Sequence, residues 1–364
     1  MNAPWLAHYP PGVPAEAEVN AYASLNELLD EAFRRHADLC AASCLDAQIL
    51  FRDIDRHALA MAAWFQSVGL APGARVAVMM PNLPQYLVSI AAILRAGMVV
   101  VNVNPLYTAR ELEHQLRDSG AEAVVVLENF AATLQEAIEK TAVKHVVLTA
   151  LGDLLGPWRG RWLTFAVRHL ARMVPEFQLP LDEGRSVTRF PAVLETGRRT
   201  SLRPVTVGPE DVAFLQYTGG TTGISKGATL LHRNVVANIM QCEAWFKPVL
   251  DRVGDRQLTI VCALPLYHIF ALTICALMGA RFGAMNILIP NPRDIAGVVR
   301  TLAKYRINMF PAVNTLFNAL ANDPGFARLD FSGLLVSNGG GMAVQQATAQ
   351  RWLKVTGWWQ GAMA

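Results

Sequence analysis

A short stretch near the middle of the chain, residues 215–227, brings together glycines, hydroxyl side chains and one cation; it reads Leu-Gln-Tyr-Thr-Gly-Gly-Thr-Thr-Gly-Ile-Ser-Lys-Gly. The glycines let backbone N–H groups approach an anion without obstruction from side chains. The threonines add hydroxyl donors, and the lysine supplies a positive charge. The groups concerned are Thr218, Gly219, Gly220, Thr221, Thr222, Gly223 and Lys226. This composition predicts a loop that binds a polyphosphate.

The nearest alternative for this loop is the P-loop of nucleoside triphosphatases, Gly-x-x-x-x-Gly-Lys-Ser/Thr. That pattern requires glycine before the lysine and a hydroxyl residue after it, whereas Ser225 precedes Lys226 and Gly227 follows it. The match therefore fails at both positions. A plain flexible loop between two strands is a second alternative, but it gives no reason for the lysine or for the run of hydroxyls.

Two further stretches are candidates for the same site. Residues 264–270 read Leu-Pro-Leu-Tyr-His-Ile-Phe and place His268 just after an expected strand. Open α/β sheets bind ligands beyond the carboxyl ends of their strands, although a histidine in an apolar stretch can also be a core residue. Residues 337–342 read Ser-Asn-Gly-Gly-Gly-Met. Gly339, Gly340 and Gly341 would let a base or a ribose lie against the backbone.

The three stretches, in this order, resemble the adenylate-forming superfamily and, within it, the bacterial long-chain fatty-acyl-CoA synthetases. The superfamily loop runs Thr/Ser-Gly-Thr-Thr-Gly-x-Pro-Lys-Gly, and this chain departs from it with Ser225 where proline is usual. The resemblance covers nearly the whole chain; it includes residues 79–82, 96–107, 110–116, 291–294, 313–320 and 351–357.

The resemblance implies an AMP-forming long-chain fatty acid–CoA ligase that uses ATP, Mg²⁺ and coenzyme A. A fatty carboxylate would attack the α-phosphate of ATP to give an acyl-adenylate and diphosphate, and the thiol of coenzyme A would then displace AMP. Lys226 and His268 would be the catalytic residues, His268 at the mouth of the acyl tunnel, and Thr218 would contact Mg²⁺. The implied ATP-binding residues are Tyr217, Thr218, Gly219, Gly220, Thr221, Thr222, Gly223, Ser225, Lys226, Gly227, His268, Gly339, Gly340 and Gly341.

The last residues depart from the family pattern. In the family, the segment after Gly357 continues into a Tyr-Gly-Leu-Thr-Glu motif whose glutamate helps to hold Mg²⁺. An aspartate for the ribose and a mobile C-terminal lid with a lysine follow later. Here residues 358–364 read Trp-Trp-Gln-Gly-Ala-Met-Ala. We therefore expect the N-terminal portion of such an enzyme, truncated before the remaining strands and the lid, and poorly soluble because a sheet edge would be exposed.

The composition indicates a cytoplasmic α/β protein. Of the 364 residues, 52% are hydrophobic and 17% are charged, which excludes a disordered or fibrous chain. The formal net charge of +3 is too small to indicate nucleic-acid binding. Five cysteines are an odd number, and no secretory signal opens the sequence, which together indicate a reducing compartment. Cys40 and Cys44 lack partners with zinc-type spacing and are expected to be buried thiols.

Apolar runs separated by amphipathic stretches predict the elements that position these motifs, since valine-rich runs are typical of a parallel sheet covered on both faces. In the first half, strands are expected at 49–51, 75–80, 98–103, 123–127 and 145–149, and helices at 24–36, 53–67, 84–96, 109–119 and 131–140. After a polar link at 182–209, strands are expected at 211–215, 228–231, 258–264, 285–289, 308–310 and 334–336, and helices at 235–245, 269–279, 292–304, 313–322 and 344–355.

These elements predict two stacked α/β subdomains. The first spans residues 1–205, with an N-terminal arm and a basic amphipathic insert. The second spans residues 206–357 and carries the phosphate loop, and residues 358–364 form a divergent tail. Residues 258–280 are free of charge over a length that could span a membrane, but Pro265, Tyr267 and His268 interrupt them. A strand, a turn and a buried helix are expected there instead.

The basic insert at 154–174 contains four arginines and no acidic residue. As a helix it would place Trp162, Ala166, Leu170 and Met173 on one face and Arg161, Arg168 and Arg172 on another. Such a helix could lie on the inner face of the plasma membrane as a peripheral contact. The alternative is a surface helix that packs on the domain and keeps its arginines in water.

Two alternatives to an active ligase stay open. The chain could be a non-catalytic remnant that binds ATP or fatty acid or pairs with another subunit. It could also be a fatty acyl-AMP ligase that passes its product to a carrier protein. The chain could also form a homodimer. No nucleic-acid partner is expected.

Overall fold

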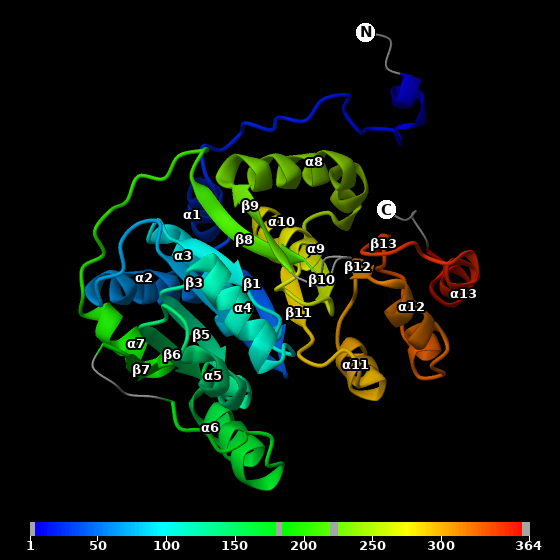
Figure 1. Ribbon diagram of the computed structural model, residues 1–364. Coiled ribbons are helices and arrows are strands. Elements are labelled where there is room, and N and C mark those ends of the chain that lie inside the picture. The colour runs from blue at the N-terminus through cyan, green and yellow to red at the C-terminus, as the bar shows by residue number, and fades with distance from the viewer. Residues whose placement is uncertain (1–3, 180–183, 219–224, 359–364) are drawn as a thin grey trace.

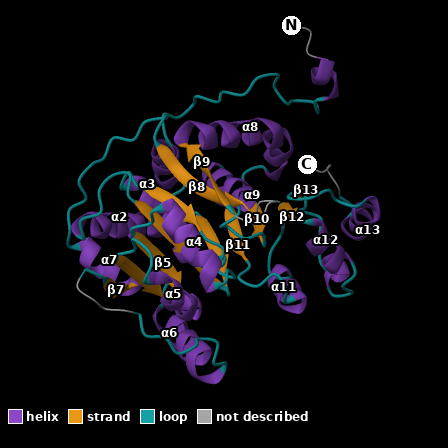
Figure 2. Ribbon diagram, in the orientation of Figure 1, coloured by secondary structure: helices purple, strands orange, loops and turns teal. Residues whose placement is uncertain are grey.

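The computed structural model describes residues 4–179, 184–218 and 225–358. Within them the strands form two sheets, with helices around and between them (Figures 1 and 2). The seven-stranded sheet has the order β7 (Ser186–Arg189), β6 (His145–Thr149), β5 (Ala123–Leu127), β3 (Arg75–Met79), β4 (Val99–Asn102), β8 (Val212–Thr218) and β9 (Lys226–Leu231). The six-stranded sheet has the order β13 (Val336–Gly339), β12 (Met309–Ala312), β10 (Thr259–Cys262), β11 (Met285–Leu288), β1 (Cys40–Cys44) and β2 (Ala47–Leu50).

Both sheets are parallel except for one hairpin each, β8–β9 in the first sheet and β1–β2 in the second. The predicted parallel architecture is therefore confirmed. Strand β1 was not predicted, because its small residues, Cys-Ala-Ala-Ser-Cys, carry little of the β-branched character that marks a strand. The predicted polar link likewise contains β7 and helix α7 (Phe190–Arg198), whose short lengths hide the usual periodicity.

The helices follow the expected alternation with the strands. In the first half they are α1 (Leu25–Arg35), α2 (Phe51–Ser67), α3 (Pro84–Arg95), α4 (Ala109–Ser119), α5 (Ala131–Ile138) and α6 (Pro157–Phe165), which a π-helical turn at 166–170 continues. In the second half they are α8 (His232–Leu250), α9 (Ile269–Ala271), α10 (Met278–Arg281), α11 (Ile295–Leu302), α12 (Asn314–Ala321) and α13 (Gln346–Thr356). A π-helical stretch, Leu272–Leu277, joins α9 to α10.

Of the N-terminal helix caps predicted at Ser24 and Asp53, the first is present in the structure. Ser24 caps α1 and accepts a hydrogen bond from the Glu27 N–H, as predicted, but the Glu27 carboxylate accepts from the Ala23 N–H at 2.7 Å. The predicted cap of α2 at Asp53 is wrong. That helix begins at Phe51, and Asp53 lies inside its first turn, where a carboxylate still interacts favourably with the helix dipole.

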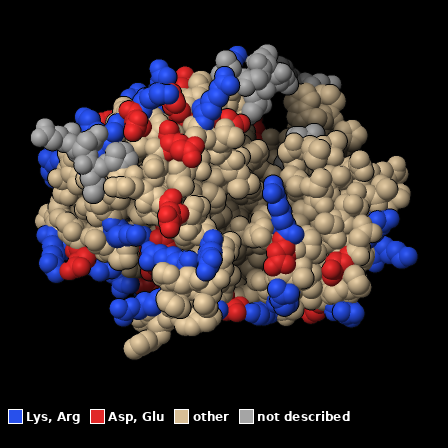
Figure 3. Space-filling view, turned by 60° about the horizontal axis from the view of Figure 1, so that its bottom comes forward, with Lys and Arg blue, Asp and Glu red and all other residues tan. Residues whose placement is uncertain are grey.

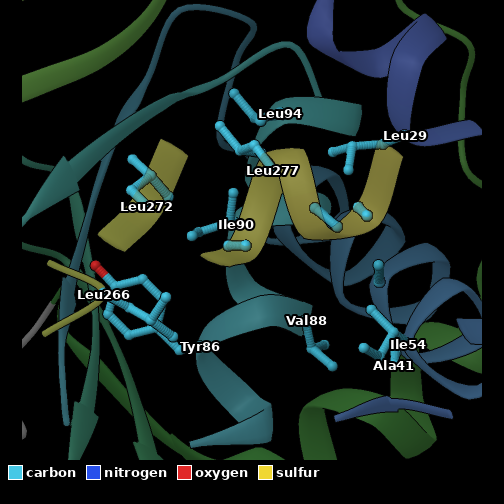
Figure 4. Packing of buried hydrophobic residues seen from close by; sticks show 14 of the residues in the cluster. Leu29, Ala41, Ile54, Tyr86, Val88, Ile90, Leu94, Leu266, Leu272 and Leu277 are labelled. Carbon is cyan, nitrogen blue, oxygen red and sulfur yellow. The ribbon is translucent and has the colours of Figure 1, made fainter. Parts of the chain in front are cut away.

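Alternate residues of each strand enter different parts of the core, so that each sheet is covered on both faces. Val76 and Val78 of β3 face a cluster that continues through α3 and α9–α10 to the second sheet, while Ala77 and Met79 face α4 and α5. Figure 4 shows the shared cluster from close by, with Tyr86, Val88 and Ile90 of α3 among its labelled members. The core thus bridges the two sheets.

Strand pairing crosses the predicted boundary at 205/206 in both directions. Strands β8 and β9, which follow that boundary in sequence, complete the first sheet, and β1 and β2, which precede it, extend the second. The subdomain limits stay predictions, but the sheets are built from both halves of the chain. Non-local pairing of this kind leaves no local signal in the sequence.

The uncharged stretch at 258–280 folds as predicted into β10, a turn and the buried helical run α9–α10. In the described parts of the chain, we find no helix with the length and apolar character needed to cross a bilayer.

Candidate nucleotide-binding site

The β8–β9 hairpin carries the predicted phosphate loop. Thr218, the last residue of β8, pairs with Lys226, the first residue of β9, so that a hydroxyl and an ammonium group flank the two ends of the loop. Both residues are exposed to solvent. The remaining predicted loop residues, Gly219, Gly220, Thr221, Thr222 and Gly223, lie outside the described residues.

Side chains of helix α4 contact the β8–β9 hairpin at two points. The Tyr217 hydroxyl donates to Asp118 at 2.5 Å, and the His114 Nε2 atom lies 3.3 Å from the Ser225 carbonyl oxygen. Burial, and then the bond to Asp118, raise the pKa of Tyr217, so its phenol remains a donor at neutral pH. A Cβ atom on Gly227 would lie 2.9 Å from the Tyr217 ring, which explains the glycine opposite this tyrosine. Tyr217 thus holds the hairpin in place.

His268 lies at the start of α9 and is exposed at the surface. Its Nδ1 atom accepts the N–H of Phe270 at 3.3 Å, which leaves Nε2 to carry the proton of the neutral ring and to donate outward. Partial burial lowers the pKa of His268. A neutral imidazole with a free N–H donor is suited to contact a phosphate oxygen.

The glycine-rich turn after β13 touches the segment that carries His268. A Cβ atom on Gly340 would lie 2.8 Å from the Phe270 ring, so the aromatic ring rests against bare backbone. Gly341 has a φ of +76°, a left-handed conformation that glycine adopts without strain. Gly339 is buried and ends β13 in register with Ala312. The second and third predicted stretches therefore meet in space.

A chain of buried hydrogen bonds joins the phosphate hairpin to the same segment. Gln216 of β8 donates to the Tyr267 carbonyl oxygen at 2.8 Å and accepts from Asn102 at 2.8 Å. Asn102 in turn accepts from the Tyr86 hydroxyl at 2.5 Å. None of these three side chains was predicted from the sequence as part of the site. Their signal is a polar side chain inside an apolar strand run, which is costly to bury unless it is paired.

Asn82 is a second positioning residue that was not predicted as part of the site. Its amide donates to the carbonyl oxygens of Cys262 and Leu264, and its carbonyl accepts from the Leu266 N–H, each at 2.8 Å. Asn82 is almost fully buried. Its side chain therefore fixes the bend between β10 and the turn that carries His268.

Replacing Asn82 by alanine is expected to lower the free energy of unfolding by about 3 kcal/mol, because three buried backbone groups lose their partner. Urea denaturation followed by circular dichroism measures the change. Asn318→Ala, on the exposed face of α12, is the matched control and should change stability by less than about 0.5 kcal/mol. An equal, small effect for both variants would show that the Asn82 bonds do not hold the turn.

Asn338, the residue before Gly339, has a buried side-chain amide. It is 2% exposed, and neither atom of its amide has a hydrogen-bond partner among the described residues. Its neighbour Ser337 points the other way and accepts from the Trp352 indole at 2.9 Å. Asn338 therefore offers one donor and one acceptor on the face of β13 that continues toward the core shared by the two sheets.

Among the described residues, no group of three or more His, Cys, Asp or Glu side chains is placed so that it could hold a metal ion. Thr218 offers one hydroxyl oxygen. Mg²⁺ is commonly held by one or two protein oxygens, several waters and the phosphates of a nucleotide, so a single hydroxyl fits an ion that arrives with ATP.

The fold is that of adenylate-forming CoA ligases. A crystal structure of an anthranilate CoA ligase in complex with anthranoyl-AMP has a TM-score of 0.75 at 20% identity and covers 92% of this chain and 58% of that one. A structure of a long-chain-fatty-acid-CoA ligase from Archaeoglobus fulgidus has a TM-score of 0.74 at 24% identity and covers 96% of this chain and 63% of that one.

The chain belongs to the AMP-binding enzyme family, whose model matches residues 29–361. It is similar to a long-chain-fatty-acid–CoA ligase from Escherichia coli O157:H7, with 49% identity over 358 residues. That match covers 98% of this chain but 62% of the relative. The chain thus spans less than two thirds of the length of this relative.

Proposed function

We propose that this chain forms the nucleotide- and acyl-binding part of an AMP-forming long-chain fatty acid–CoA ligase. The observation that carries the proposal is the contact among the three predicted stretches. Gln216 of β8, within the hairpin, donates to the Tyr267 carbonyl oxygen, and Phe270, two residues beyond His268, rests on Gly340. The similarity to long-chain ligases supports the choice of a fatty acid as substrate.

In this proposal the loop between Thr218 and Lys226 binds the β- and γ-phosphates of ATP. The Lys226 ammonium stabilises the charge that develops on the diphosphate as the carboxylate attacks the α-phosphate. Mg²⁺, when bound with ATP through Thr218, would neutralise phosphate charge. The neutral His268 donates Nε2–H beside the α-phosphate at the entrance to the acyl site. Tyr217, Ser225 and Gly227 keep the hairpin in shape.

The adenosine lies against the glycine turn at Gly339, Gly340 and Gly341 in this proposal. An asparagine amide can pair in a bidentate manner with an adenine, donating to one ring nitrogen and accepting from the exocyclic amine. Asn338 has both groups free among the described residues, so we assign it to the base. Coenzyme A would enter as the second substrate and displace AMP. A cytoplasmic location stays a prediction, and the possibility of a homodimer stays open.

The proposal is tested with the purified chain, ATP, Mg²⁺ and palmitate. Palmitate-dependent exchange of labelled diphosphate into ATP reports adenylate formation alone, and added coenzyme A reports the complete reaction. Mg²⁺-dependent ATP binding without exchange would favour the non-catalytic alternative. Product transfer to a phosphopantetheine carrier, but not to coenzyme A, would favour the acyl-AMP ligase. A folded chain without Mg²⁺-dependent ATP affinity would contradict the proposal and both alternatives that use the nucleotide.

A further inference from the structure

Helix α6 and the turn after it present an unusual face to solvent. The segment projects at the bottom of Figure 1, away from both sheets. Five large apolar side chains are exposed along it, and we call them the apolar stripe: Trp158 (84%), Trp162 (65%), Phe165 (53%), Leu170 (67%) and Met173 (61%). A surface helix normally turns its apolar side toward the core. This segment buries Gly160 and Val167 but leaves these five large apolar side chains in solvent.

The inward side of the segment combines small, apolar and polar contacts: Gly160 and Val167 are buried, and Leu163 packs against the core. Gly160 packs directly on Gly152, since a Cβ atom on Gly160 would lie 2.1 Å from the Gly152 carbonyl oxygen. Arg168 forms an ion pair with the buried carboxylate of Glu128, and the Asn129 amide donates to the Met173 carbonyl oxygen at 2.9 Å. The outward direction of the apolar stripe is therefore set by these inward contacts, the buried ion pair among them.

These contacts change the interpretation of the insert. Arg168, predicted to share a face with Arg161 and Arg172, instead faces the buried Glu128. Trp162, Leu170 and Met173 of the predicted apolar face are all exposed, so this face does not pack on the domain. Sequence periodicity alone could not show this, because it does not say which side of a helix meets the domain. The alternative of a surface helix with its arginines in water stays open, since Arg161 and Arg172 are exposed too.

Positive charge surrounds the apolar stripe. Arg159, Arg161 and Arg172 are exposed. Arg159 pairs with Asp46 at 3.4 Å, whereas Arg161 and Arg172 have no ion-pair partner among the described residues, and residues 154–175 include no carboxylate. Figure 3, which turns this side of the molecule forward, shows Lys and Arg side chains around the lower tan protrusion. Beside the helix, a groove of about 980 Å³ is lined by both basic and acidic side chains, among them Arg198, Arg56 and Asp53. Arg56 pairs there with Asp53 at 2.8 Å. The surface suits an anionic and partly apolar partner.

We propose that the apolar stripe and its arginines dock the protein on the surface of an anionic lipid bilayer. Tryptophan side chains settle at the boundary between headgroups and acyl chains, where their rings are buried and their N–H groups stay hydrated. Guanidinium groups pair with lipid phosphates in a bidentate manner. A projecting helix with aromatic and basic side chains therefore fits a bilayer surface, where lipid phosphates lie above the apolar acyl chains. The proposal does not depend on the catalytic function.

A second copy of the chain is the less favoured occupant. In a two-fold symmetric dimer the same surface meets itself, so the arginines of the two copies would face each other. Residues 154–175 offer no carboxylate to balance them. Buried like charges oppose association.

Flotation with lipid vesicles tests the proposal without ATP or coenzyme A. The chain is expected to float with phosphatidylcholine vesicles that contain about one third phosphatidylglycerol, and only weakly with pure phosphatidylcholine. The double variant Trp158→Ser/Trp162→Ser should reduce binding at least about tenfold, because it removes the aromatic anchors. Arg161→Gln/Arg172→Gln should reduce it about tenfold for anionic vesicles. Salt at about 0.5 M should weaken the binding of the native chain.

Matched controls separate docking from general surface effects. Trp5→Ser removes another exposed tryptophan, and Arg252→Gln/Arg256→Gln removes two exposed arginines, all far in sequence from α6. These controls should float like the native chain. In Trp158→Phe/Trp162→Phe, binding should persist while quenching of tryptophan fluorescence by lipids brominated on their acyl chains falls.

Thermal melting of each variant checks that the fold is retained. Three results would overturn the proposal: equal flotation of the native chain and the Trp158→Ser/Trp162→Ser variant, equal loss in the controls, or a doubling of mass in solution that the same variant abolishes. The last outcome would assign the stripe to a dimer interface.

Discussion

Replacing Lys226 by alanine is expected to weaken the binding of Mg·ATP by about 10- to 100-fold, because a hydrogen bond between charged groups contributes about 1.5–3 kcal/mol. The rate of palmitate-dependent diphosphate exchange should fall further, by about 100- to 1000-fold, since the charge on the departing diphosphate is largest in the transition state. Lys226 is exposed and opens β9 opposite Thr218, so its loss removes charge without opening a cavity. Isothermal titration calorimetry and the exchange assay measure the two effects.

Two further variants make this result specific. Lys226→Arg keeps the positive charge and should retain most of the affinity for ATP. Lys144→Ala removes an exposed lysine that precedes β6, at the opposite end of the first sheet from the hairpin, and should leave both measurements unchanged. If Lys226→Ala bound ATP as the native chain does, the phosphate-loop assignment would be lost.

Replacing Trp352 by alanine is expected to lower the free energy of unfolding by about 3–5 kcal/mol. The side chain has no solvent exposure and packs edge-on against Phe310 and Phe317, with ring centroids 5.1 and 4.6 Å away. Its indole N–H donates to the Ser337 hydroxyl. Because Ser337 lies two residues before Gly339, the variant should also loosen the glycine turn and weaken ATP binding.

The effect is measured by urea denaturation and compared with two variants. Trp352→Phe keeps an aromatic ring but leaves the Ser337 hydroxyl unpaired, so its loss should be about 1–3 kcal/mol. Trp5→Ala removes an exposed tryptophan and should cost less than about 0.5 kcal/mol. A loss below about 1 kcal/mol for Trp352→Ala would mean that α13 is not held to β13 by this side chain.

The strongest local signals were sufficient to predict most elements. The valine runs of β3, β4, β5 and β6, with Gly97 and Gly120 after the helices that precede β4 and β5, predicted a parallel sheet, and the structure confirms it. These strands are buried on both faces, so apolar character is required at every position. The small-residue strand β1 and the short elements β7 and α7 lacked such a signal and were missed.

The candidate site likewise has parts that were visible in the sequence and parts that appear only in the fold. The sequence by itself was enough to single out the β8–β9 hairpin, the His268 segment and the glycine turn as candidates, because glycines, hydroxyls and a lysine at fixed spacing carry their chemistry locally. Their roles in binding stay predictions. Only the tertiary structure decided that Asn82, Gln216 and Phe270 join these stretches, since each contact spans a long separation in the chain.

The tertiary structure also decided which way α6 faces. Composition showed that the insert has aromatic and basic side chains, but the Gly152–Gly160 contact and the Glu128–Arg168 ion pair turn its aromatic side to solvent. The local sequence decides which side chains a helix can expose to solvent. Which side it presents depends on contacts with residues outside the helix, from the nearby Gly152 to the more distant Glu128, and these exist only in the folded protein.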